Sequence, residues 1–169
     1  MMTERLTFDF FKRDVLLVAP ELLGKLLVRW FDDGHTERYR ITETEAYRGE
    51  EDLACHASKG RTPRTEVMFG KGGTVYVYLI YGQYWLLNFV TGMDGDASAV
   101  LIRGIEGYSG PGRVSRILQL DKSFYGEDMI NSSRIWVEDA VPINNFNTSK
   151  RIGVDYSGEW ASKPWRFFF

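Results

Sequence analysis

The sequence predicts a mixed α/β (α+β) fold, in which one compact domain over residues 1–169 is built on a curved, mostly antiparallel β-sheet with flanking helices and a protruding β-hairpin. A chain of 169 residues suits a single domain with its own core. Short runs of β-branched and aromatic residues alternate with turn signals, which is typical of antiparallel strands. No repeat, low-complexity tract or linker divides the sequence.

The first part of the chain predicts helix followed by a strand pair. Asp14 is expected to cap a short helix, Pro20 to occupy a first helical position, and Gly24 to lie near a helix end. Strands are expected at 26–30 and 39–45, on either side of an Asp-Asp-Gly turn.

The rest of the chain predicts a long polar loop, a hairpin, a further strand, a helix and a last strand. A loop of this length in so small a domain is often functional. The expected ranges are 48–72 for the loop, 74–79 and 85–90 for the hairpin, 99–102 for the next strand, 113–120 for the helix, 135–138 for the last strand, and 142–150 for a second polar loop.

Charge is unevenly distributed, although the formal net charge is only -2. The charged residues of 43–52 are all acidic except Arg48, and those of 59–71 are all basic except Glu66. This arrangement fits a reactive carboxylate beside a phosphate-binding rim, although charge alone favours two unrelated solvated faces.

Composition limits the cofactors and the cellular setting. The single cysteine, Cys55, excludes an internal disulfide and is expected to be a small buried residue. One cysteine with His35 and His56 makes a poor zinc ligand set, so no metal is expected. No apolar run is long enough to span a bilayer, and the N-terminus lacks a secretory pattern, so we expect a cytoplasmic protein.

Two carboxylates are candidates for chemistry. Strand alternation is expected to place Ile41, Glu43 and Glu45 on one face. A pair of carboxyl groups is the pattern of sugar hydrolases, which is one hypothesis for function. The alternative is that one of them forms an ion pair with Arg40 or Arg48.

The tyrosines of the predicted hairpin are the other candidates. Tyr76 and Tyr78 share a strand face, where they could pack in the core or form a platform that stacks on bases. Tyr81 falls at the hairpin tip, where an aromatic side chain can act as a wedge between base pairs. A non-catalytic nucleic-acid-binding module is therefore a second hypothesis.

Taken together, an ordered set of motifs resembles the alkyladenine (3-methyladenine) DNA glycosylase family, of the mammalian type that also occurs in bacteria. The resemblance covers the chain from about residue 7 to its end. It rests on Glu43-Thr44-Glu45-Ala46-Tyr47, Glu51-Asp52-Leu53-Ala54-Cys55-His56, Arg61-Thr62-Pro63-Arg64, Met68-Phe69, Val75-Tyr76-Val77-Tyr78, Ile80-Tyr81-Gly82, Asn88, Gly110-Pro111-Gly112, Arg151-Ile152-Gly153-Val154, Gly158-Glu159-Trp160 and Lys163-Pro164.

The resemblance implies a monofunctional enzyme of base excision repair. Such enzymes flip an alkylated or deaminated purine out of double-stranded DNA and hydrolyse its N-glycosidic bond, without a metal or organic cofactor. By matching position, Glu45 activates the water and Arg103 lies near it. We expect a monomer associated with the nucleoid through DNA.

The resemblance also implies how the flipped base is held. Tyr47, His56 and Tyr78 match residues that enclose the base, and Asn88 matches the residue that excludes guanine. Tyr81 matches the side chain that fills the gap left in the duplex. The DNA backbone is expected to contact four basic residues, Arg61, Arg64, Lys71 and Arg113.

Overall fold

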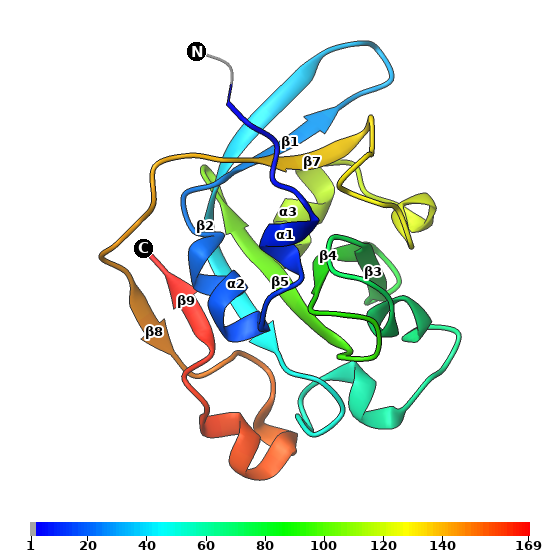
Figure 1. Cartoon of the computed structure of the whole chain (residues 1–169), viewed down its shortest axis with the longest axis vertical. Helices are drawn as coiled ribbons and strands as arrows, with labels where there is room; N and C mark the ends of the chain where they lie inside the picture. The colour runs from blue at the N-terminus through cyan, green and yellow to red at the C-terminus, as the bar shows by residue number, and fades with distance from the viewer. Residues whose placement is uncertain (1–2) are drawn as a thin grey trace.

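An antiparallel β-sheet runs through the computed structural model, which describes residues 3–169 (Figure 1). Every strand pair is antiparallel, so the predicted α+β architecture is confirmed. Six strands form the main path of the sheet, in the order β3 (Val75–Ile80), β4 (Tyr84–Thr91), β5 (Ser98–Ile105), β2 (Thr36–Tyr47), β1 (Leu26–Trp30) and β7 (Ile135–Glu138).

Three short strands and several helical segments complete the fold. The short strand β6 (Tyr108–Ser109) pairs with β5, and β9 (Arg166–Phe168) pairs with β2 and with β8 (Asn147–Ser149). Strand β8 lies inside the segment expected to be a loop, so that expectation was wrong for three residues. The helical segments are α1 (Phe8–Phe11), α2 (Val15–Glu21), α3 (Pro111–Ile117), η1 (His56–Lys59), η2 (Glu66–Phe69), η3 (Lys122–Phe124) and η4 (Asp155–Ser162).

Helix α2 begins where the sequence predicts, because the Asp14 side chain accepts a hydrogen bond from the backbone N–H of Leu16. Pro20, expected at a first helical position, instead lies near the C-terminal end of this helix. The cap at Asp14 fixes the start six residues earlier, and the proline's missing N–H costs only one bond in the last turn.

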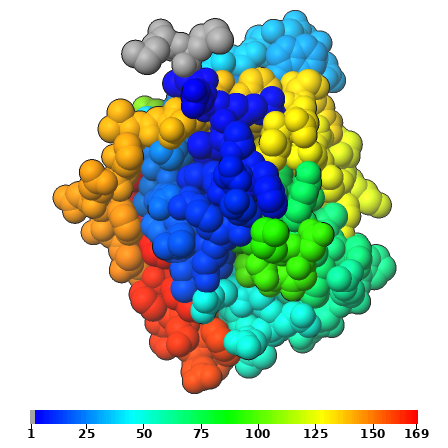
Figure 2. All heavy atoms as spheres, viewed as in Figure 1, coloured from blue at the N-terminus to red at the C-terminus, as the bar shows by residue number. Residues whose placement is uncertain are grey.

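The N-terminal helices cover one face of the sheet. In Figure 1, α1 and α2 lie in front of β5, and in Figure 2 the N-terminal segment fills the middle of the same view. Apolar side chains of α2, including Val18 and Ala19, pack in one core with residues of β2, β5 and α3. Burial of these apolar side chains stabilises α1 and α2, since helices this short are not stable alone.

Strand β2 is the long central strand, and it does not alternate regularly. Its ladder with β5 has register shifts between Ile41 and Glu43 and between Glu43 and Thr44. Ile41 belongs to the main core, whereas Glu43 and Glu45 both contact Arg103, so the predicted common face holds for the two carboxylates and not for Ile41. A bulge changes the side to which the following side chains point, which accounts for the difference.

The hairpin of β3 and β4 forms as predicted and presents Tyr81 at its tip. This side chain is 83% exposed, and its backbone has a φ of 52°. Left-handed backbone is unfavourable for a residue with a Cβ, so the tip is locally strained.

The long loop between β2 and β3 is organised around a second, smaller core. Cys55, Met68 and Phe69 pack there with Tyr76, and Cys55 is buried as expected. This packing fixes the loop against the sheet, close to the carboxyl end of β2.

Candidate active site

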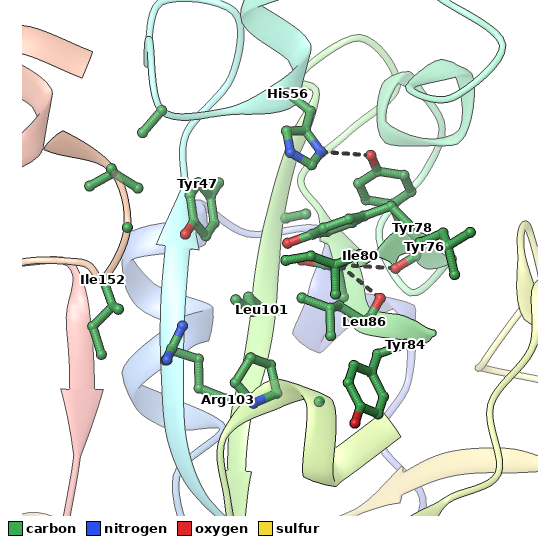
Figure 3. Close-up of a pocket in the computed structure, with 18 of the residues that line it drawn as sticks. Tyr47, His56, Tyr76, Tyr78, Ile80, Tyr84, Leu86, Leu101, Arg103 and Ile152 are labelled. Carbon is green, nitrogen blue, oxygen red and sulfur yellow. Dashed lines mark hydrogen bonds between the residues drawn. The ribbon is translucent and has the colours of Figure 1, made fainter. Parts of the chain in front are cut away.

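A cavity of about 530 Å³ opens beside the carboxyl end of β2 (Figure 3). Its volume lies in the range of roughly 300–1,000 Å³ that is common for ligand sites. In Figure 3, Ile152, Tyr47 and Arg103 lie on one side of the cavity, and His56, Tyr78 and Leu86 lie on the other. The lining is largely aromatic and apolar, with a few polar groups directed into it.

Seven residues predicted from sequence line this one cavity; two are Arg64 and Tyr81, and the other five come from separate elements. They are Tyr47 on β2, His56 on η1, Tyr78 on β3, Asn88 on β4 and Arg103 on β5. The pairing of β3, β4, β5 and β2 as neighbours brings them together.

Glu45 lies immediately behind the cavity wall and is not itself among the lining residues. Its side chain is fully buried. Oε1 accepts a hydrogen bond of 2.8 Å from the Tyr47 hydroxyl, and Oε2 accepts one of 2.7 Å from the backbone N–H of Ile152. The Nη1 of Arg103 is 3.6 Å from Oε1. All three of these partners line the cavity.

Burial raises the pKa of Glu45, because desolvation disfavours its charged form. Arg103, the Ile152 N–H and the Tyr47 hydroxyl act in the opposite direction, since each favours the carboxylate. The pKa of Tyr47 is raised well above the usual tyrosine range, first by burial and then by the Glu45 charge. Tyr47 therefore remains a protonated donor.

Glu43 is engaged elsewhere. Its Oε2 accepts hydrogen bonds from the Nε atoms of Arg103, at 3.1 Å, and Arg166, at 2.6 Å. Neither Arg40 nor Arg48, the partners considered from sequence, contacts it among the described residues. Glu43 does not line the cavity and its carboxylate is held by two guanidinium groups, so it is poorly placed to be the second catalytic carboxyl of a sugar hydrolase.

On the opposite wall, His56 is held in its neutral form. One ring nitrogen, Nδ1, is 2.8 Å from the Tyr76 hydroxyl, and its ring packs edge-on to Tyr78 at 4.5 Å between centroids. Burial, together with the Arg64 charge, lowers the pKa of His56 to about 4. A neutral imidazole can both donate and accept, which suits contact with a polar ring edge.

Asn88 uses its amide group to bridge two strands. Its Nδ2 donates to the backbone oxygens of Tyr76, at 3.1 Å, and Leu86, at 3.3 Å. The side chain is buried and fixed, so it narrows the cavity at a defined point.

The predicted backbone contacts are spread over different surfaces. Arg64 lines the cavity and lies 5.1 Å from the Tyr78 ring centroid. Arg61 pairs with Glu66 at 2.8 Å on the neighbouring surface. Lys71 lies 3.7 Å from Asp128 and does not line the cavity. Arg113 lies on α3, beside the cavity residues Pro111 and Gly112.

The C-terminal wall was not assigned a role from sequence. Ile152, Gly153 and Val154 form one side of the cavity, and Gly153 has a φ of 75°. The signal was present in the motif Arg151-Ile152-Gly153-Val154, where a glycine between branched apolar residues suits the left-handed backbone found there. The cavity also includes Tyr76, Tyr84, Leu86, Leu101 and Tyr156.

Comparison with known proteins identifies the family. The sequence model described as methylpurine-DNA glycosylase matches residues 9–109 and 106–169. The chain belongs to this family. A protein of Methanocella arvoryzae named "Putative 3-methyladenine DNA glycosylase" is 46% identical over 180 residues, which cover 95% of this chain and 90% of the relative.

Proteins with the same name in Legionella pneumophila strain Corby and Myxococcus xanthus are 45% and 44% identical to this glycosylase. The matches cover 97% and 95% of this chain, and 93% and 87% of the relatives. The glycosylase is therefore a hydrolase of N-glycosyl bonds, and the hypothesis of a purely binding module is set aside.

Two further observations concern residues 3–169 of the glycosylase. Within them, no group of three or more His, Cys, Asp and Glu side chains is arranged to hold a metal ion. None of their helices has the length and apolar character needed to cross a membrane.

Proposed function

We propose that this glycosylase flips an alkylated or deaminated purine out of duplex DNA into the cavity and hydrolyses its N-glycosidic bond with a water activated by Glu45. The observation that carries the proposal is the placement of the Glu45 carboxylate, whose partners Tyr47, Arg103 and Ile152 all line the cavity. A rigid strand holds the carboxylate, as precise chemistry requires.

Glu45 retains capacity to accept a water proton. A carboxylate has about four lone-pair sites. The Tyr47 hydroxyl and the Ile152 N–H occupy two of them, while Nη1 of Arg103, at 3.6 Å from Oε1, is too far to occupy a third. In the proposed complex the water reaches Glu45 through the wall that these three residues form.

The proposed step balances simply. The water oxygen bonds to the anomeric carbon of the sugar, the carbon–nitrogen bond breaks with its electron pair going to the base, and the water proton goes to Glu45. A purine alkylated at N3 or N7 carries positive charge, so it departs as a neutral base. A neutral deaminated purine departs as an anion, which takes up one proton from water. Arg103 holds the carboxylate ionised through its charge before the step.

The walls explain how a damaged base could be held. Tyr47 and Tyr78 supply flat apolar surface, and the neutral His56 supplies a donor or an acceptor. Such walls tolerate many ring shapes, so rejection of normal bases must come from a steric clash. The fixed amide of Asn88 is suited to crowd the exocyclic amine of guanine.

The hairpin tip supports the base-flipping step. Extrusion of a base costs a few kcal/mol of stacking and pairing. An exposed aromatic side chain on a strained backbone has little structural reason to be there, and Tyr81 has both properties. We propose that Tyr81 enters the gap and offsets part of the lost stacking, while Arg61, Arg64, Lys71 and Arg113 contact phosphates.

The decisive variant is Glu45→Gln, assayed on a duplex with one alkylated purine by strand cleavage in alkali after base loss. Removal of a general base is expected to reduce single-turnover release by at least about a hundredfold. Lesion binding, measured with the same duplex, should persist. The matched control is Glu127→Gln, which removes a carboxylate paired with Arg134 away from the cavity. Release by Glu45→Gln at the rate of that control would refute the role of Glu45.

A further inference from the structure

A buried ion pair joins Asp52 and Arg151 behind the wall of the cavity. The Nη1 of Arg151 is 2.5 Å from Oδ2 of Asp52, and Nη2 is 3.0 Å from Oδ1, so the contact is bidentate. Both side chains are fully buried. Neither residue lines the cavity, so neither contacts a base held there.

The pair connects three separate segments of the chain. Arg151 also donates to the backbone oxygens of Ala46, at 2.9 Å, and Trp160, at 3.1 Å. Asp52 accepts from the backbone N–H groups of Arg48, at 2.9 Å, and Ala54, at 3.0 Å. The end of β2, the loop that follows it and the C-terminal segment are thereby fixed to one another.

The Arg151 guanidinium also lies between two aromatic rings. Its central carbon is 4.9 Å from the centroid of Tyr47 and 5.0 Å from that of Trp165. Tyr47 is the donor to Glu45, and Ile152, the residue after Arg151, provides the other donor. Arg151 therefore supports both of the hydrogen bonds that Glu45 accepts.

Stability alone is a weak reason to bury this pair. Desolvation of two charges can exceed their attraction, and apolar residues of similar volume often serve a fold equally well. A bidentate contact gives geometric precision, which apolar packing does not. The location of the pair, one residue from the Ile152 N–H, indicates where that precision is used.

We propose that Asp52 and Arg151 are positioning residues that hold the N–H of Ile152 and the ring of Tyr47 against the Glu45 carboxylate. The inference rests on the proposed function, since it requires Glu45 to be the base. It predicts that loss of the pair impairs the chemical step more than lesion binding.

The effect should appear in the pH dependence of base release. The groups that face Glu45 are Arg103 from β5, Tyr47 and Glu43 from β2, Tyr78 from β3 and the Ile152 N–H from the C-terminal wall. The N–H favours the carboxylate, so its displacement raises the pKa of Glu45 further. Because the proposed reaction needs the ionised form of Glu45, the acid limb of the pH profile of base release then moves to higher pH.

The experiment compares single-turnover pH profiles of three proteins with that of the parent. Asp52→Asn/Arg151→Gln removes both charges together, so no unpaired charge is left buried. A backbone variant, in which an ester oxygen replaces the N–H of Ile152, removes one donor and leaves the ion pair intact. Glu127→Gln/Arg134→Gln removes a partly buried ion pair remote from Glu45 and serves as the control.

The double variant and the ester variant should both move the acid limb up by about 0.5–1 pH unit, with a lesion Kd within about threefold of the parent. The control should lose stability without such a shift. An unshifted limb in the ester variant overturns the inference, even where the double variant does not fold. Glu45→Gln is assayed in parallel to distinguish failure of the proposed function from failure of this inference. Undiminished base release by Glu45→Gln refutes Glu45 as the base, and does not by itself bear on the positioning role of Asp52 and Arg151.

Discussion

The Tyr47 hydroxyl donates a 2.8 Å hydrogen bond to Oε1 of Glu45, two residues earlier on the same strand. Residues two apart on a strand share a face, so the strand alone places the Tyr47 hydroxyl on the same side as the Glu45 carboxylate. Because it favours the charged carboxylate, it partly offsets the effect of burial on the pKa of Glu45. The strand itself therefore helps to hold the proposed base ionised.

Tyr47→Phe removes this bond and keeps the ring. The pKa of Glu45 should rise, so release on the acid limb of the pH profile should fall by about three- to tenfold and recover at higher pH. Single-turnover rates across the pH range measure this. Tyr156→Phe, which removes a different hydroxyl at the cavity, is the control. Equal losses at every pH would contradict the explanation.

Glu45→Gln should also change stability. Because burial raises the folded-state pKa of Glu45 above its unfolded value, the carboxylate destabilises the fold at neutral pH, and this penalty disappears below the unfolded pKa of about 4.3. The variant should therefore melt at higher temperature at pH 7.5, by about 2–4 °C per kcal/mol gained. The gain should vanish near pH 4. A lower Tm at pH 7.5 would count against a net destabilising carboxylate.

Much of the fold follows from local sequence signals. The strand at Leu26–Trp30, the β3–β4 hairpin and the Asp14 cap were predicted because alternation, turn residues and capping act over a few residues. Strand β8 was missed because it forms by pairing with β9, a strand that comes later in the chain. Its three residues, Asn-Thr-Ser, carry no apolar pattern.

The candidate site, like the fold, was predicted only in part from the sequence. Strand alternation made Glu45 a candidate and family motifs gave Tyr47 and His56 their roles, but sequence could not show that Glu45 lies behind the wall of the cavity. Nor could it show that Arg151 and Asp52 pair, because buried charges are indistinguishable from solvated ones in a sequence. Such contacts are set by tertiary packing between distant segments.

His56 should remain neutral until strongly acidic pH, since burial and Arg64 lower its pKa to about 4. The unfolded chain binds this proton near pH 6.5, so the fold loses stability as the pH falls from about 6.5 to 4. His56→Gln should reduce that loss. Proton NMR of the His56 imidazole across this pH range measures the titration directly. A His56 midpoint at or above that of a free imidazole would contradict the prediction.

Asn88→Ala should widen the cavity where guanine is proposed to clash. Release of undamaged guanine should rise by about tenfold or more, since steric exclusion is worth about 1–3 kcal/mol. The fold should lose about 1–2 kcal/mol, because the backbone oxygens of Tyr76 and Leu86 lose a donor. Excision assays on undamaged and alkylated duplexes measure selectivity. Unchanged guanine release, with alkylated-base release intact, would exclude Asn88 as the discriminating residue.

Tyr81→Asn should separate stability from lesion capture. Asparagine tolerates the left-handed backbone at this position, so relief of strain should stabilise the fold by up to about 1 kcal/mol. Loss of the wedge should weaken capture of the lesion duplex by about tenfold, more than it slows single-turnover release at saturating enzyme. Gln119→Asn is the matched control, since Gln119 has the same φ of 52° and does not line the cavity. Its Tm should rise similarly with capture unchanged, and an equal loss of capture in both variants would show that Tyr81 has no special role.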